Sequence, residues 1–416
     1  MRAPGAWLLA VCTVSVVSAA SVGCDGEAPP AVSAVATAER LARVASGEVA
    51  AVRTSASLAA GAPVVVGEPG PAHLASRCGD CHGSIHGGWS RSGHARSNQG
   101  ALYLAMRSKS EPVACDPCHA PLRSILPPGD MLAEEGVTCD ACHMLRDVEL
   151  GPTRAKLTLL LSGDKRWGTL CDAQDHYFHT TGCSPLFKES KLCAGCHQWS
   201  TRAASGEPLP VLKEYDDWLA SPAAAAGKSC QGCHMPAVHG EVATGWTRRA
   251  SVGSHELLGE SGALRRGAVR LTMQVEENGQ ALRAEVSLTN TNEAHAAPTG
   301  FPGRQLALEL TLLDAAEQKL SRSARVFGRV LVDEAGREVP FYAAQAQGSD
   351  NRIGPGQTRR EVFTFDRGAA VSARARVVWR AMSPAVASAL GVSVEEQVLA
   401  ESKVPLRRGQ GSRRAP

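Results

Sequence analysis

Five short motifs of one composition carry most of the chemistry that this sequence can do. In each motif two cysteines stand three positions apart, and a histidine directly follows the second cysteine. Residues three and four positions apart share one face of a helical turn, so two thiols and one imidazole can converge on a single group. The motifs are Cys78-Gly79-Asp80-Cys81-His82, Cys115-Asp116-Pro117-Cys118-His119, Cys139-Asp140-Ala141-Cys142-His143, Cys193-Ala194-Gly195-Cys196-His197 and Cys230-Gln231-Gly232-Cys233-His234.

This spacing is typical of covalent attachment of haem c. The thiols would add to the porphyrin vinyl groups as thioethers, and the histidine would bind the iron on its proximal side. Zinc knuckles do not account for a histidine after every cysteine pair, and a thioredoxin-like redox pair occurs once, beside a βαβ pattern that is absent here. Ordinary disulfides are the remaining alternative. We therefore predict five bound haem c groups, with all ten motif cysteines as thioether residues and His82, His119, His143, His197 and His234 as proximal iron ligands.

The composition fits a core that is partly built from such groups. Aromatic residues make up only 4% of the 416 residues, which is little for a core of this length. The formal charge of +3 gives no basic footprint for nucleic acid. Five haems would add roughly ten negative propionate charges. We expect no nucleic-acid partner and a net acidic holoprotein.

The N-terminal residues 1–24 read as an export signal of the lipoprotein type. The apolar run from Ala6 to Ala20 is too short to span a bilayer comfortably. Ser21-Val22-Gly23-Cys24 resembles a lipobox that would lipidate Cys24, whereas Ser18-Ala19-Ala20 suits ordinary signal peptidase. Both cleavage alternatives stay open. We expect a periplasmic protein, or a lipoprotein anchored to a membrane and facing an extracytoplasmic compartment.

The composition and the residue pattern of the rest of the chain change several times. Residues 25–72 read as a low-complexity tether, and residues 73–240 as a mainly α, loop-rich pentahaem cytochrome c domain. A linker at 241–262 leads to an all-β, immunoglobulin-like sandwich at 263–406, and a basic tail follows at 407–416. Alternation of apolar and polar residues predicts the sandwich strands. These alternating runs are 269–275, 282–288, 306–312, 362–365 and 373–379, and 384–390 is expected to be helical.

The flanks of the motifs resemble the multihaem cytochrome c-554 family, which is related to the haem domains of hydroxylamine oxidoreductase and pentahaem nitrite reductase. The matching features lie between Cys78 and Arg304. They are Trp89-Ser90-Arg91-Ser92-Gly93-His94-Ala95, Gly136-Val137-Thr138-Cys139, Cys233-His234-Met235-Pro236 and Asn292-Glu293-Ala294-His295-Ala296-Ala297-Pro298-Thr299-Gly300. The last segment has Ala294 where the family has glycine.

In that family, histidines of these segments bind haem irons on the distal side. The resemblance implies this role for His94 and His295, and His179 is a third candidate. Eight histidines lie outside the five motifs, so every iron can in principle have two histidine ligands. An iron left with one ligand would be a candidate reaction centre.

Two cysteines remain outside the motifs and the N-terminal segment. Cys171 and Cys183 are expected to form a disulfide in an oxidising compartment, holding His176 and His179 in place. A haem-ligating or redox-active thiol is the alternative.

These features favour an electron carrier that moves single electrons between extracytoplasmic redox proteins. The first alternative is a redox enzyme that acts on a small nitrogen or sulfur compound at one open haem. No Cys-x-x-Cys-Lys site, typical of pentahaem nitrite reductases, is present, and none of the four tyrosines has the cross-linking context of hydroxylamine oxidoreductase. A gas sensor with one open haem is the second alternative.

Overall fold

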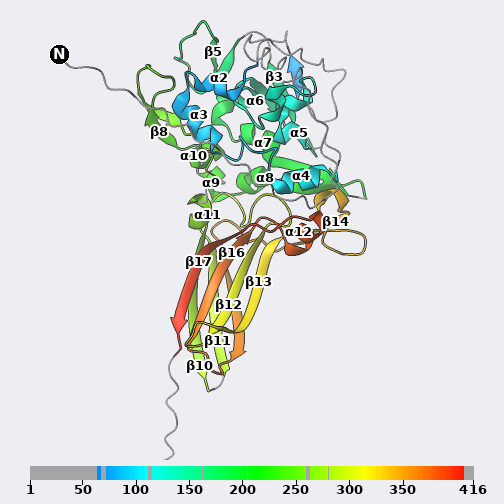
Figure 1. Cartoon of the computed structure of the whole chain (residues 1–416), viewed down its shortest axis with the longest axis vertical. Coiled ribbons are helices and arrows are strands. Elements are labelled where there is room, and N and C mark those ends of the chain that lie inside the picture. Colours follow the sequence, from blue (N-terminus) through cyan, green and yellow to red (C-terminus); the bar gives the residue numbers. More distant parts are fainter. Residues whose placement is uncertain are drawn as a thin grey trace, which may run out of the picture. The chain divides into compact units, whose positions relative to one another are not determined.

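Figure 1 shows the computed structural model, which describes residues 63–66, 72–110, 115–160, 164–203, 205–258, 263–279 and 281–406. These residues all belong to one compact unit, 49–416. The expected export signal with Cys24, most of the expected tether, and the expected basic tail lie outside the described residues. None of the described helices has the length and apolar composition needed to cross a membrane.

The chain is not mainly helical: 24% of it is helix and 37% is strand. The expectation of a mainly α haem segment is therefore wrong. The helices between residues 72 and 258 are short, and the chain between them forms small hairpins and ribbons. In one of these strands, 156–160, buried residues alternate with more exposed ones, which is the period of a strand and not of a helix.

Most helices of this first part are single turns at or near a motif. They are α2 (Ala75–Gly79), α3 (Gly83–Ser90), α4 (Ala101–Arg107), α5 (Asp116–His119), α6 (Cys139–His143), α7 (Lys191–His197), α8 (Glu214–Leu219), α9 (Pro222–Ala225) and α10 (Cys230–His234). Three 3₁₀ turns accompany them: Pro121–Ser124, Met131–Glu134 and Pro185–Lys188.

The chain between these helices contains short strands, which form four small sheets. The sheets are β1 (Val64–Val66) and β2 (Leu145–Glu149) on either side of β3 (Lys156–Leu160); β4 (Arg166–Gly168) with β5 (Thr181–Cys183); β6 (Gln198–Arg202) with β7 (Pro208–Lys213); and β8 (Ala237–Gly240) with β9 (Arg249–Gly253). In the segment expected to be a tether, residues 64–66 are thus a strand, parallel to β3.

The C-terminal part contains two antiparallel sheets, whose long strands run alongside one another in Figure 1. All five alternating runs of the sequence lie within these strands. One sheet has the order β10 (Val269–Asn278), β11 (Ala281–Asn290), β15 (Thr358–Asp366). The other has the order β14 (Ala346–Asp350), β13 (Lys319–Val332), β12 (Gln305–Leu313), β16 (Ser372–Arg380), β17 (Glu396–Pro405). The helices α11 (Ala263–Gly267) and α12 (Pro384–Leu390) and the 3₁₀ turn Phe341–Ala343 complete this part.

Three apolar clusters stabilise the unit. The inner faces of the two C-terminal sheets share one core, with Leu308, Leu310 and Phe363 almost fully buried. A second core, around Leu122 and Met144, lies among the haem motifs. The third cluster joins Met106 and Val211 of the first part to residues of the second, Leu331, Phe341, Met382, Val386 and Ala387 among them. The two parts therefore share buried apolar surface.

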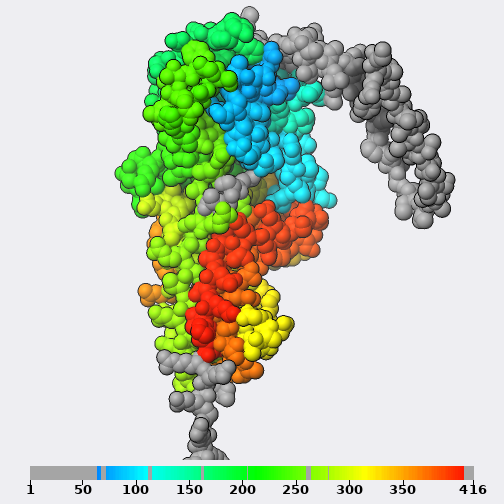
Figure 2. Space-filling view, turned by 60° about the vertical axis from the view of Figure 1, so that its left-hand side comes forward, coloured from blue at the N-terminus to red at the C-terminus, as the bar shows by residue number. Residues whose placement is uncertain are grey.

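The described part of the segment expected to be a linker, residues 241–258, packs against the haem motifs. Thr244 donates its backbone N–H to the carbonyl of Cys81 (2.8 Å), and Ser254 donates to Pro236 (2.9 Å). In Figure 2 the blue helices near the first motif lie against the green segment that follows the fifth. This arrangement brings residues far apart in the sequence to one site.

Candidate haem-binding site

Each motif forms about one turn of helix. The N–H of His82 donates to the carbonyl of Cys78 (2.8 Å), and the N–H of His119 donates to Cys115 (3.0 Å). The third and fifth motifs are the helices α6 and α10, and the fourth ends α7. A bond from residue i to residue i−4 closes the turn that puts both cysteines and the histidine on one side.

The thiols and imidazoles of all five motifs line one continuous cavity of about 2760 Å³. Pockets for single small molecules are typically about 300–1,000 Å³. The ten motif cysteines form no disulfides and are free to make thioether bonds. The size of this cavity and its donor set therefore fit several haem groups.

The attachment sites also adjoin one another. Thiols of different motifs lie within hydrogen-bonding reach, which makes the first motif a neighbour of the third and the fourth a neighbour of both the second and the fifth. The thiol pairs are Cys78 with Cys139, Cys118 with Cys196, and Cys193 with Cys230. Groups bound at these sites would form an array rather than isolated centres.

Backbone carbonyls fix the protonation of three proximal histidines. Nδ1 of His82 lies 2.5 Å from the carbonyl oxygen of Val242. Nδ1 of His119 lies 2.6 Å from that of Ser97, and Nδ1 of His143 lies 2.6 Å from that of Trp167. A carbonyl oxygen only accepts, so each Nδ1 carries the proton and donates it. The lone pair of Nε2 is left for the iron, as in other histidine–metal sites.

Three proximal imidazoles face a second imidazole at nearly constant distance. The ring centroids are 6.0 Å apart for His82 and His179, and 6.2 Å apart both for His143 and His255 and for His197 and His94. Two metal–nitrogen bonds of about 2.0 Å, plus roughly 1.1 Å from each nitrogen to its ring centre, would put two axial imidazoles about 6.2 Å apart. The spacing fits one iron between each pair.

Burial keeps several of these imidazoles neutral. Burial, together with the charge of neighbouring histidines, lowers the pKa of His94, of His234 and of His255 to about 4 in each case. A neutral imidazole has a lone pair for a metal, whereas an imidazolium has none. His197 differs from them: burial lowers its pKa, but the carboxylate of Glu214 outweighs this and raises it.

His295 reaches the fifth motif from the C-terminal part. It is a charge neighbour of His234 and contributes to lowering the pKa of that imidazole. The loop that carries it is held by the fully buried Asn290, whose amide donates to the carbonyls of His295 (3.1 Å), Ile353 (2.9 Å) and Gly354 (3.1 Å). The buried amide of Asn290 thus fixes the position of the loop that carries the His295 imidazole.

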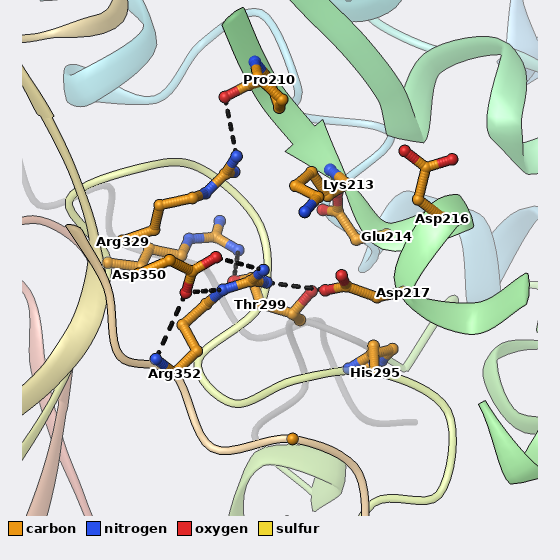
Figure 3. A network of polar contacts seen from close by, with 12 residues as sticks. Pro210, Lys213, Glu214, Asp216, Asp217, His295, Thr299, Arg329, Asp350 and Arg352 are labelled. Atoms are coloured by element: carbon orange, nitrogen blue, oxygen red, sulfur yellow. Dashed lines mark hydrogen bonds and ion pairs between the residues drawn. The ribbon is translucent and has the colours of Figure 1, made fainter. Parts of the chain in front are cut away.

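Buried arginines join this loop region to the motif-bearing part (Figure 3). Arg352 lies between Asp217 (2.7 Å) and Asp350 (2.9 Å), with only 8% of its side chain exposed. Arg329 donates to the backbone carbonyls of Pro210 (2.7 Å) and Val211 (2.5 Å). A buried ion pair with several hydrogen bonds fixes a relative orientation more than it adds stability.

The second motif has a different environment. The ring of Tyr103 lies 4.6 Å from that of His119, and its hydroxyl donates to the buried Asp116 (3.1 Å). All thirteen histidines lie in described residues. Nine of them are the five proximal histidines, the three that face a proximal ring, and His295. The contacts of the remaining four lie elsewhere: His73 with Phe178, His86 with Trp89, His176 with His179 and His239 with Arg248.

A disulfide joins Cys171 and Cys183, whose Cα atoms are 4.8 Å apart. It closes the loop that contains His176 and His179, and Cys183 ends β5, which pairs with β4. The loop therefore has a covalent tie at the strand that follows His179.

The structure places the three candidate distal histidines at three different motifs. His179 faces the first, His94 the fourth, and His295 neighbours the fifth. Sequence reasoning missed His255, which faces the third motif. His255 stands in the segment expected to be a linker, where no repeat or periodicity marks it.

Comparison with solved structures gives an informative match. A penta-haem cytochrome c552 from Thermochromatium tepidum has a TM-score of 0.65 and 21% sequence identity, and the match covers 80% of this chain and 99% of that one. This similarity shows that the chain has the fold of a multihaem cytochrome c. A relation to cytochrome c-554 or hydroxylamine oxidoreductase in particular stays a prediction.

Two further similarities are too weak to carry an argument. A superoxide reductase structure and a putative beta-galactosidase from Bacteroides fragilis each match 33% of this chain, both with a TM-score of 0.16 and with 10% and 16% identity; the matches cover 86% and 15% of those chains. No family model and no curated protein sequence matches the chain.

Proposed function

We propose that the chain is a c-type cytochrome that carries five covalently bound haems and moves single electrons between redox proteins outside the cytoplasm. The observation that carries the proposal is the 6.0–6.2 Å spacing of three imidazole pairs, each with one member from a Cys-x-x-Cys-His motif. An iron held by two imidazoles cycles between its ferric and ferrous states without an open position for a substrate.

In this proposal the protein's own groups hold and tune the haems. The two thiols of each motif fix one haem covalently, and backbone carbonyls orient three of the proximal imidazole rings. His179, His94, His255 and His295 close the second side of the irons at the first, fourth, third and fifth motifs. The adjoining attachment sites support electron exchange from haem to haem, because neighbouring groups would lie close together.

The partners and the location follow from the sequence and belong to the proposal. The predicted export signal at 1–24 supports a location outside the cytoplasm. Electron donor and acceptor are proposed to be redox proteins, and Cys24 is the proposed site of a membrane-anchoring lipid.

An anaerobic redox titration of the purified holoprotein tests the function. The protein should take up five electrons per chain and then give them to a small soluble ferricytochrome c, returning fully to its oxidised spectrum. Uptake of fewer than five electrons, or reduced haems that the ferricytochrome cannot reoxidise, would contradict the proposal.

A second candidate function is catalysis at the haem of the second motif. One observation favours it: four proximal histidines have an assigned second histidine, whereas the contacts of the remaining four histidines place none of them beside His119. An iron with one protein ligand could bind a small nitrogen or sulfur compound. Carbon monoxide added to the reduced protein separates the two: a spectrum without any shift would exclude this candidate, and a shift of one haem in five would support it.

A further inference from the structure

One proximal histidine has a charged partner where three others have a neutral one. Nδ1 of His197 lies 3.8 Å from Oε1 of Glu214. This is longer than a direct hydrogen bond, so the carboxylate acts mainly through its charge. In His82, His119 and His143 the same nitrogen meets a backbone carbonyl.

The register of a small hairpin fixes this contact. Strand β6 begins directly after His197, and its first residue, Gln198, pairs with Lys213, the last residue of β7. His197 and Glu214 are the next residues outward on the two strands and therefore lie opposite each other. The backbone N–H of Lys213 donates to Oε2 of Glu214 (3.0 Å), which leaves Oε1 toward the imidazole.

Glu214 lies largely out of solvent. Its side chain is 19% exposed, whereas that of His197 is 49% exposed before any haem covers it. The next carboxylate on α8, Asp216, points in another direction (Figure 3) and accepts from the side-chain amide of Gln198 (2.6 Å). A charge that water does not screen acts more strongly on its neighbours than an exposed one.

A carboxylate behind a metal-bound histidine changes the metal's redox balance. Its negative charge on the Nδ1 side makes the imidazole a stronger electron donor. The ferric iron carries one more positive charge than the ferrous iron and gains more from this donation. Reduction, in which one electron is added to the ferric iron, therefore becomes less favourable.

We propose that Glu214 is a positioning residue that lowers the reduction potential of the haem attached at Cys193 and Cys196. The inference rests on the proposed function, because it concerns how the haem array passes electrons. The fourth motif adjoins both the second and the fifth. A lowered potential at this junction makes an electron leave the junction haem quickly, so that the haem connects its neighbours instead of storing the electron.

Glu214→Gln tests the inference, because it removes the charge and keeps the shape. In an EPR-monitored redox titration of the holoprotein, one of the five reduction steps should move to a higher potential, while all signals that are low-spin in the wild type stay low-spin. Asp216→Asn is the matched control: it removes a charge from the same helix and should leave all five steps in place.

Three results would overturn the inference. The five potentials could be unchanged in Glu214→Gln; Asp216→Asn could shift a step equally; or Glu214→Gln could change the spin state, which would assign the carboxylate a structural role. A wild-type protein that takes up fewer than five electrons would instead contradict the proposed function, before any variant is measured.

Discussion

The imidazole of His255 lies 6.2 Å from that of His143, with the ring planes inclined by 23°. The two residues are 112 positions apart, and the β8–β9 hairpin returns the chain to the third motif between them. His143 is held by the carbonyl of Trp167, and Nδ1 of His255 lies 2.9 Å from the carbonyl of Gly253. Both rings therefore have Nε2 free for one iron.

His255→Ala should convert one haem from low spin to high spin, because the iron of the third motif loses its second ligand. The same variant should gain one carbon monoxide binding site on reduction. EPR of the oxidised protein and absorption of the reduced protein measure the two effects. His239→Ala is the control, since His239 is exposed on β8 and contacts Arg248. If both variants keep the wild-type spectra, His255 is not a ligand.

Asn290→Ala should release the loop that presents His295. It removes the bonds that the buried amide donates to three backbone carbonyls and the bond that its Oδ1 accepts from the N–H of Asn292. Each buried polar group left without a partner typically costs about 1–3 kcal/mol of unfolding free energy. We expect a lower denaturation midpoint and partial conversion of one haem to high spin. Asn278→Ala, at an exposed end of β10, should change neither. Loss of stability with unchanged spin state would show that Asn290 does not position the imidazole.

The disulfide should stabilise both the fold and one ligand. For a loop of this length, Cys171→Ser with Cys183→Ser should lower the unfolding free energy by roughly 2–3 kcal/mol. Guanidinium unfolding followed by haem absorbance measures this effect. The variant should also show a higher fraction of high-spin haem as guanidinium is added below the transition, because His179 is no longer tied. A stability equal to that of the wild type would contradict the structural role of the disulfide.

The interface around Arg352 predicts a dependence on pH. Burial raises the pKa of Asp350, but the hydrogen bonds and charge of Arg352 outweigh it and hold the pKa below its usual value. A carboxylate whose pKa is lower in the folded state stabilises the fold above its unfolded pKa of about 3.9, and this contribution disappears as the pH falls through the folded value. Asp350→Asn should therefore be less stable than the wild type at pH 7, and the difference should shrink below about pH 4. Denaturation midpoints measured from pH 7 to pH 3 check this; a constant difference would refute it.

The parts of the site that depend on local spacing were open to prediction from the sequence. The five motifs form helical turns because positions i and i+4 fall on one face, and the two remaining cysteines form a disulfide in the structure. Period-two patterns marked the strands β10, β11, β12, β15 and β16 of the C-terminal sheets, but not the long strands β13 and β17. The segment 156–160 has the same period, but over too short a run to stand out.

The parts that depend on long-range register could not be predicted. His255 reaches the third motif because Val238 pairs with Val252, and Glu214 reaches His197 because Gln198 pairs with Lys213. Neither strand pair is long enough to be recognised before the chain is folded. The prediction of a mainly α segment at 73–240 was wrong for the same reason. Its small sheets form between segments that show no strand pattern on their own.

The haem content of the purified chain tests the central claim most directly. The intact mass should exceed that of the polypeptide by five haems, and the haems should remain attached after acid–acetone extraction because thioether bonds hold them. A lower number, or haem that is lost on extraction, would contradict the account of five covalent attachment sites.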